Sequence, residues 1–192
     1  MKKVILMAAI MLSSVGAYAQ HAVGSLTIQP KVGVNIANLT DVDDADARIG
    51  LAAGAELEYQ ASELFSLSGG LVYSMQGAKH SEHGVDYTVK LDYLNIPILA
   101  NVYVAKGLAV KLGVQPAFNL SAKGKVESGG SSIESDFDEV KSFDFAIPVG
   151  ASYEFNNFVI DARYNWGLTK IADDAKAKNS VFQITLGYKF GL

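Results

Sequence analysis

The residues most suited to metal chemistry lie in polar segments between apolar ones. His80-Ser81-Glu82-His83 brings two imidazoles and a carboxylate together, and these groups can bind Zn²⁺ or Cu²⁺. Zinc sites usually take three or four ligands from a rigid frame, so we interpret this segment as a polar loop tip. The acidic run 41–46 (Asp41 to Asp46) could bind Ca²⁺, but it lacks the glycine and terminal glutamate of an EF-hand loop. We predict no metal ligand and no cofactor, with at most weak binding of divalent ions by the acidic run.

A catalytic triad could also be assembled on paper from polar segments. The candidate residues are His80, His83, Asp86, Ser131 and Ser132. All of them fall in predicted loops rather than at strand ends, where a rigid geometry would be available. The chain has no cysteine, which excludes cysteine nucleophiles, thiolate metal sites and disulfides. We therefore predict that the protein is not an enzyme.

A second set of charged residues lies inside apolar, alternating segments. Both signs are present, and a buried charge is costly unless it has a partner. We predict that these residues form a structural network of interior ion pairs. They are Lys31, Glu56, Glu58, Lys111, Asp144, Glu154, Asp161, Arg163 and Lys189. Arg163→Leu should destabilise the fold by leaving carboxylates without a partner.

Strict alternation of apolar and polar residues marks most of the chain as β-strand. The clearest case is the closing stretch VFQITLGYKFGL. Eight strands are expected, at 25–39, 48–60, 65–79, 87–104, 108–122, 141–155, 158–169 and 180–191. They are long for soluble strands and match the roughly 9–11 residues of a tilted transmembrane strand. Pro97 in the fourth strand predicts a local irregularity.

The predicted connections alternate between long and short. The long ones are 40–47, 80–86, 123–140 and 170–179, and the short ones are 61–64, 105–107 and 156–157. Transmembrane barrels have longer extracellular loops and short periplasmic turns, so both chain ends are expected on the periplasmic side. The segment 123–140 is rich in glycine and serine, which predicts a flexible loop that could contact a partner.

The polar face of these strands indicates which side meets lipid. It carries many small residues and few charges, unlike the charged exterior of a soluble barrel, and small residues suit the narrow interior of eight strands. Hydrophobic residues make up 49% of the chain and charged residues 19%. Aromatic residues near the short turns predict a periplasmic girdle. They are Tyr59, Phe65, Tyr103, Phe155, Phe158, Tyr188 and Phe190. We predict an all-β, eight-stranded antiparallel transmembrane barrel.

The first residues predict export. Lys2 and Lys3 precede a short apolar run, and Ala17-Tyr18-Ala19 is a small-x-small cleavage site. We expect a signal peptide at 1–19, cleavage after Ala19, and a barrel domain at 20–192. The formal net charge of −4 argues against a nucleic-acid partner.

The motifs YLNIP at 93–97 and ARYN at 162–165, together with KVGVNIANL and FDFAIPVGASYEF, resemble the PorT-like, porin-related family of small outer-membrane β-barrel proteins of Gram-negative bacteria. The resemblance implies an outer-membrane location, contact with lipid and lipopolysaccharide, and insertion by the barrel-assembly machinery. Members often carry an acidic residue where Asn95 stands, so Arg163 is expected to use another partner, such as Asp161 or Glu56.

Three functions remain open after these arguments. We favour a structural or interaction protein that acts through its extracellular loops, and a role associated with secretion is included in this class. A small-solute pore is the alternative, although eight strands filled by ion pairs predict a closed lumen. A rim enzyme or a metal binder is the least favoured.

Overall fold

The described part of the chain is built from antiparallel strands. The computed structural model describes residues 21–42, 45–82, 85–129, 131–136, 140–173 and 175–192. The strands are β1 (Leu26–Leu39), β2 (Asp46–Ser62), β3 (Phe65–Glu82), β4 (Val85–Asn95), β5 (Ile98–Ala105), β6 (Leu108–Ser128), β7 (Ser131–Asp136), β8 (Phe143–Phe155), β9 (Phe158–Lys170), β10 (Lys178–Tyr188) and β11 (Phe190–Gly191). No helix among these residues is long and apolar enough to cross a membrane.

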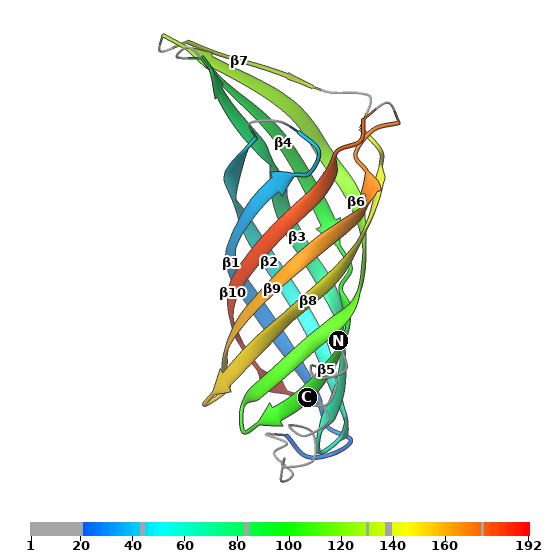
Figure 1. Cartoon of the computed structure of the whole chain (residues 1–192). Helices are drawn as coiled ribbons and strands as arrows, with labels where there is room; N and C mark the ends of the chain where they lie inside the picture. The colour runs from blue at the N-terminus through cyan, green and yellow to red at the C-terminus, as the bar shows by residue number, and fades with distance from the viewer. Residues whose placement is uncertain (1–20, 43–44, 83–84, 130, 137–139, 174) are drawn as a thin grey trace, which may run out of the picture.

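The strands close into a barrel whose members run obliquely around its axis (Figure 1). β4 and β5 are two halves of one barrel strand, interrupted at Ile96 and Pro97, and both halves pair with β3 and β6. β10 and β11 likewise pair with β1 and close the ring, from Leu39 opposite Asn179 to Thr27 opposite Gly191. The ring therefore has eight antiparallel strands, which confirms the predicted fold class. The interruption at Pro97 confirms the expected irregularity.

The two faces of the barrel wall differ as the alternation predicts. Large apolar side chains such as Val32, Leu112 and Ile160 are about half exposed on the outer surface. The inner face is polar, and at its glycines the backbone of the neighbouring strand lies very close. A Cβ added to Gly33 would lie 2.0 Å from the carbonyl oxygen of Ile184 on β10, so only glycine fits this point of the closing seam.

The longest connection differs from its prediction. We call the end of the barrel that carries β7 the extracellular end and the opposite end the periplasmic end, following the sequence prediction. The sequence predicts a flexible loop at 123–140, but β6 continues to Ser128 and forms a hairpin with β7. Segment 80–86 is not a long loop either, because strand pairing continues to Glu82 opposite Val85. Backbone pairing across neighbouring strands holds residues 80–82, 85–86, 123–128 and 131–136 in extended form.

These extensions form a four-stranded sheet that projects beyond the barrel (Figure 1). It comprises residues 78–82, 85–90, 123–128 and 131–136 of β3, β4, β6 and β7. We call it the extracellular sheet. On its outer side, β7 pairs with β6 and with no other described strand.

Candidate functional site

The middle of the barrel is crossed by a cluster of buried charges that we call the central cluster. Arg163 on β9 forms paired contacts with Glu56 on β2, at 2.8 and 3.1 Å, and with Asp161, at 2.7 and 2.8 Å. Lys31 Nζ lies 2.6 Å from Glu56, and Lys111 Nζ lies 2.8 Å from Asp161. All five residues are at most 5% exposed. Paired guanidinium–carboxylate contacts of this kind fix geometry as well as charge.

Arg163→Leu is expected to destabilise the barrel, but this geometry gives a physical reason other than stranded carboxylates. Asp161 and Glu56 both contact Arg163, while the Asn95 amide has no hydrogen-bond partner among the described residues. Each of the two carboxylates also keeps a lysine of its own. Loss of Arg163 would therefore leave two matched ion pairs rather than stranded carboxylates.

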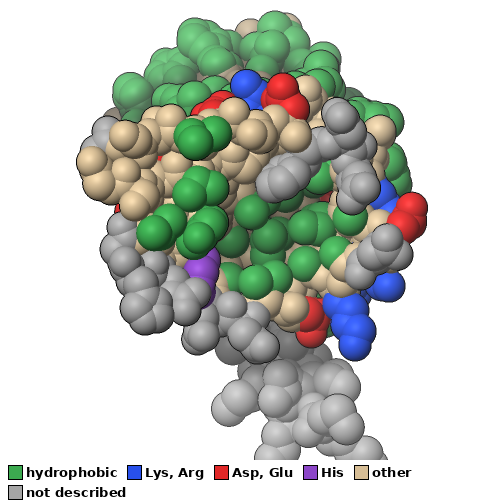
Figure 2. Space-filling view, turned by 90° about the horizontal axis from the view of Figure 1, so that it is seen from above, with side chains coloured by type: hydrophobic (Ala, Val, Ile, Leu, Met, Phe, Trp, Pro, Cys, Tyr) green, Lys and Arg blue, Asp and Glu red, His purple; other side chains and the backbone are tan. Residues whose placement is uncertain are grey.

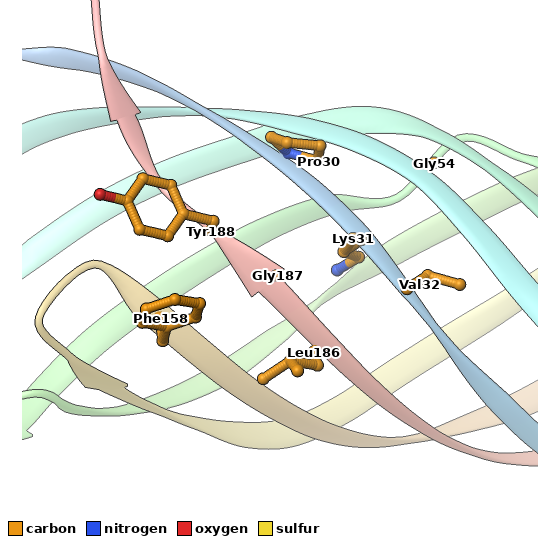
Figure 3. A pocket seen from close by; sticks show the side chains of 8 residues that line it. All are labelled: Pro30, Lys31, Val32, Gly54, Phe158, Leu186, Gly187 and Tyr188. Carbon is orange, nitrogen blue, oxygen red and sulfur yellow. The ribbon is translucent and has the colours of Figure 1, made fainter.

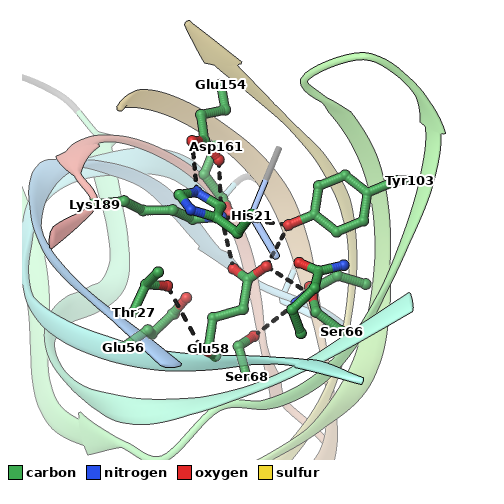
Figure 4. A network of polar contacts seen from close by, with 12 residues as sticks. His21, Thr27, Glu56, Glu58, Ser66, Ser68, Tyr103, Glu154, Asp161 and Lys189 are labelled. Atoms are coloured by element: carbon green, nitrogen blue, oxygen red, sulfur yellow. Dashed lines mark hydrogen bonds and ion pairs between the residues drawn. The ribbon is translucent and has the colours of Figure 1, made fainter. Parts of the chain in front are cut away.

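A second polar cluster lies inside the barrel at its periplasmic end (Figure 4). Lys189 Nζ lies 3.0 Å from both Glu58 and Glu154. Tyr103 and Ser66 donate hydrogen bonds to Glu58, and His21 Nε2 lies 2.9 Å from Glu154 Oε1. We call these residues the mouth cluster. Sequence reasoning placed Lys189, Glu58 and Glu154 in the interior network and Tyr103 in the girdle. It missed His21 and Ser66, because nothing in their local sequence marks them.

Tyr103 corrects one detail of the predicted aromatic girdle. The girdle prediction places it on the lipid side, but it is 3% exposed and points into the barrel, where its hydroxyl reaches Glu58. Tyr59, Phe155, Phe158 and Phe190 are about half exposed or more on the outer surface, as expected of a girdle. A tyrosine near a strand end can point to either face of the wall. Here the side chain points inward, where a buried carboxylate is a partner for its hydroxyl.

The extracellular half of the interior is less charged. Asp144 accepts hydrogen bonds from Thr169 and from Asn179, the latter at 2.9 Å, instead of contacting a lysine or arginine in the described network. Around and above it lies a cluster of buried apolar side chains. Its members are Leu39, Ala78, Leu91, Tyr93, Ala117, Ala122 and Ala177. The interior therefore becomes less charged and more apolar toward the extracellular end, although Arg48 and Asp144 are also buried there.

One face of the extracellular sheet carries a ladder of charges. Lys90 contacts Glu134 at 2.5 Å, and Lys123 reaches Glu134 at 3.3 Å and Asp136 at 3.8 Å. These side chains are 30–76% exposed. Hydrogen bonds from Lys90 and then Lys123 lower the pKa of the Glu134 carboxyl. We call this face the charged face.

The opposite face of the same sheet carries a row of apolar and aromatic side chains. His80, Tyr87, Val126 and Ile133 lie opposite one another on consecutive strands. Tyr87 is 46% exposed, Val126 39% and Ile133 72%. This row continues the inner face of the barrel, and Figure 2 shows hydrophobic side chains lining the hollow at this end. We call it the apolar row.

A shallow groove lies on the outer surface of the barrel at the closing seam (Figure 3). Its volume is about 350 Å³, and its walls include Pro30, Val32, Phe158, Leu186 and Tyr188. The β1 ladder is interrupted here between the contacts to β10 and those to β11. The Lys189 N–H instead donates to the Asn157 carbonyl at 2.8 Å. The groove is apolar and lies on the lipid-facing side of the wall.

The described loop residues that could support metal binding or catalysis are divided between the two faces of the extracellular sheet. His80 lies on the face of the apolar row, whereas Asp86 and Ser132 align through Glu127 on the charged face. Asp86 accepts a 2.6 Å hydrogen bond from Ser81. Within the described ranges, no group of three or more histidine, aspartate or glutamate side chains could hold a metal ion. His83, Asp43, Asp44 and the predicted signal peptide at 1–19 lie outside the described residues.

Comparisons with known proteins agree with this architecture. None of the curated sequences compared with the chain matches it. The solved structure of Ail, the attachment invasion locus protein of Yersinia pestis, in complex with the heparin analogue sucrose octasulfate, is similar at a TM-score of 0.52 and 17% identity, covering 88% of this chain and 100% of that one. Neisserial surface protein A is similar at a TM-score of 0.50 and 14% identity, covering 86% and 97%.

The family comparison is more direct than the structural ones. Residues 18–173 match the family model described as the outer membrane protein beta-barrel domain. The exposed apolar wall, the closed antiparallel ring and this match agree with one another. The chain therefore belongs to the outer membrane protein beta-barrel domain family and is a protein of the cell outer membrane.

Proposed function

We propose that this outer-membrane protein is an interaction protein that acts through its extracellular sheet, rather than a solute channel or an enzyme. The observation that carries the proposal is the apolar row, which exposes Tyr87, Val126 and Ile133 outside the membrane-spanning wall. Exposed apolar side chains that adjoin one another commonly mark interaction sites. A rigid sheet also presents them without the entropy cost of ordering a loop.

The lysines of the charged face are already paired, so the face of the apolar row is the better contact surface. Lys90, Lys123 and Lys125 each contact a carboxylate of the same sheet. Ail was solved with a sulfated sugar analogue, but the paired lysines here do not favour an anionic ligand of that kind. The partner we propose is therefore one with an apolar contact surface.

Two finer assignments belong to the same proposal. We propose that residues 1–19 are a signal peptide and that residues 20–192 form the mature barrel, inserted by the barrel-assembly machinery. The motifs at 93–97 and 162–165 support placing the chain among the PorT-like members, with a role associated with secretion.

A matched pair of variants tests the interaction surface. Ile133 and Ser132 are neighbours on β7 whose side chains point to opposite faces. A photo-reactive residue at each position, in intact cells, should give a discrete adduct from position 133 and none from position 132. Ile133→Asp, but not Ser132→Asp, should abolish adduct formation from a probe at Tyr87. Equal adducts from both faces, or none from either, would contradict the proposal.

A small-solute pore is the second candidate, and one observation favours it. Several interior polar groups, among them the side chains of Gln29, Asn165 and Thr185, have atoms with no hydrogen-bond partner among the described residues. Water in the lumen would satisfy them. Planar-bilayer recordings separate the candidates: a lumen crossed by the central cluster should give no stable single-channel steps, and reproducible steps would favour the pore.

A further inference from the structure

The chain turns back on itself just before the first strand. The Ser25 N–H donates to the Ala22 carbonyl at 3.0 Å, and the Gly24 N–H donates to the Gln60 carbonyl at 2.7 Å. Gly24 has a φ of 85°, a conformation that favours glycine. This turn is fixed to the periplasmic end of β2, so the residue before it is aimed at the barrel mouth instead of away from it.

His21 uses this turn to cross the mouth. Its Nε2 lies 2.9 Å from Glu154 Oε1, and its side chain is 18% exposed. Glu154 lies on β8, which is separated from β1 by β9 and β10 around the ring. The contact therefore spans the opening and does not follow the wall. Figure 4 shows His21 among the side chains of the mouth cluster.

The groups beneath His21 form a site for a nitrogen cation. Glu154 and Glu58 both contact Lys189 at 3.0 Å, and Tyr103 and Ser66 orient Glu58 by hydrogen bonds. Two carboxylates that share one lysine in this way favour positively charged donors. Lys189 is one such donor, and His21 brings a second nitrogen to Glu154.

We propose that residues 21–24 are a built-in plug of the periplasmic mouth, and that His21 occupies a cation site made by Glu154 and Glu58 beside Lys189. Withdrawal of the plug would open the lower lumen to water and small cations as far as the central cluster. This proposal is independent of the extracellular interaction, because the two sites lie at opposite ends of the barrel.

Thiol labelling can test the plug, because the chain has no cysteine of its own. Ser152→Cys places a thiol on the inner face of β8, where Ser152 is 7% exposed, and Ser62→Cys places one at the exposed periplasmic end of β2. The probe is a quaternary-ammonium methanethiosulfonate applied to the mature barrel in lipid vesicles. The labelling rate of the thiol at position 152, relative to that of the thiol at position 62, measures how open the mouth is.

His21→Ala should raise this relative rate by about tenfold or more, which corresponds to the loss of one hydrogen bond to a charged group. Added imidazole should slow the reaction again by refilling the site. Gly24→Pro should raise the rate in the same way, since it removes the turn without changing any mouth side chain. Heat-modifiable migration on gels confirms that each variant is folded, and Gly24→Pro serves alone if His21→Ala does not fold.

Two results would overturn the proposal. Wild-type labelling rates in folded His21→Ala and Gly24→Pro proteins would show that the segment closes nothing. A raised rate that imidazole leaves unchanged would show that His21 does not fill a cation site.

Discussion

The central cluster and the charged face of the extracellular sheet are made from the same residue types in opposite surroundings. In both, a cation contacts two carboxylates: Arg163 between Glu56 and Asp161, and Lys123 between Glu134 and Asp136. Arg163 is 1% exposed, whereas the Lys123 side chain is 42% exposed. Water can replace the partners of Lys123 but not those of Arg163.

This difference in exposure predicts that the ion pairs of the two regions contribute very differently to the free energy of unfolding. Exposed ion pairs typically contribute about 0–1 kcal/mol, because water screens the charges and the side chains lose entropy. Breaking a buried pair costs about 3–5 kcal/mol, since a charge is left without a partner. The two regions should therefore differ in the free energy that is lost when one partner of an ion pair is removed. Matched substitutions in the two regions measure this difference.

Glu56→Gln should give the largest effect. The side chain keeps its size, but Lys31, Lys111 and Arg163 would then share Asp161 as the remaining carboxylate of the central cluster. We expect a loss of about 3–5 kcal/mol in the free energy of unfolding. Urea titration of the barrel in lipid vesicles, followed by tryptophan fluorescence, measures it. A loss below that of Lys123→Leu would contradict the buried-charge argument.

Arg163→Met should cost less than Glu56→Gln, although it removes more contacts. Lys31 and Lys111 still neutralise Glu56 and Asp161, so the loss is limited to the hydrogen bonds of the guanidinium. We expect a loss of about 1–3 kcal/mol under the same conditions. The reverse order of the two variants would show that Arg163 stabilises the barrel mainly through its charge.

More of the barrel interior than of the extracellular sheet could be predicted from the sequence, because the two regions depend on different kinds of contact. Alternation places Lys31, Glu56 and Arg163 on the same inner face whatever the register of the strands. Which partners they contact depends on that register, which is set by pairing between residues more than a hundred positions apart, as for Arg163 and Glu56. The sequence therefore predicted that these charged residues point inward, but not that Asp144 lies outside the described ion pairs or that the others divide into central and mouth clusters.

The missed hairpin has a different cause. Glycine, serine and acidic residues in 123–140 favour a loop by local preference, yet β6 pairs there with β4 and β7. That pairing supplies cross-strand partners such as Ile133 opposite Val126, which a single segment does not reveal. Tyr103 was misplaced for a similar reason, since its partner Glu58 comes from another strand.

Lys123→Leu should give a small effect and serves as the exposed counterpart of the central variants. Its contacts to Glu134 and Asp136 are 3.3 and 3.8 Å long, and Lys90 remains with Glu134. We expect a change of less than about 1 kcal/mol in the free energy of unfolding. A loss as large as that of Arg163→Met would remove the contrast between the two regions.

The pH dependence of Glu134 should be the smallest measurable difference. Hydrogen bonds from Lys90 and Lys123 hold its pKa below the ordinary glutamate value, which is about 4.3. A carboxyl with a lowered pKa stabilises the folded state above its ordinary pKa, and this contribution is lost as the pH falls through the lowered value. Carbon-13 NMR titration of the Glu134 carboxyl should show that Lys90→Gln moves its pKa upward, toward the ordinary value, while Lys106→Gln, in the turn between β5 and β6 at the other end of the barrel, leaves it in place. Because the group is exposed, 0.5 M salt should produce most of the same shift in the unmodified protein. A pKa insensitive to both Lys90→Gln and salt would mean that the charges of this sheet do not interact, and that only the buried clusters carry electrostatic stability.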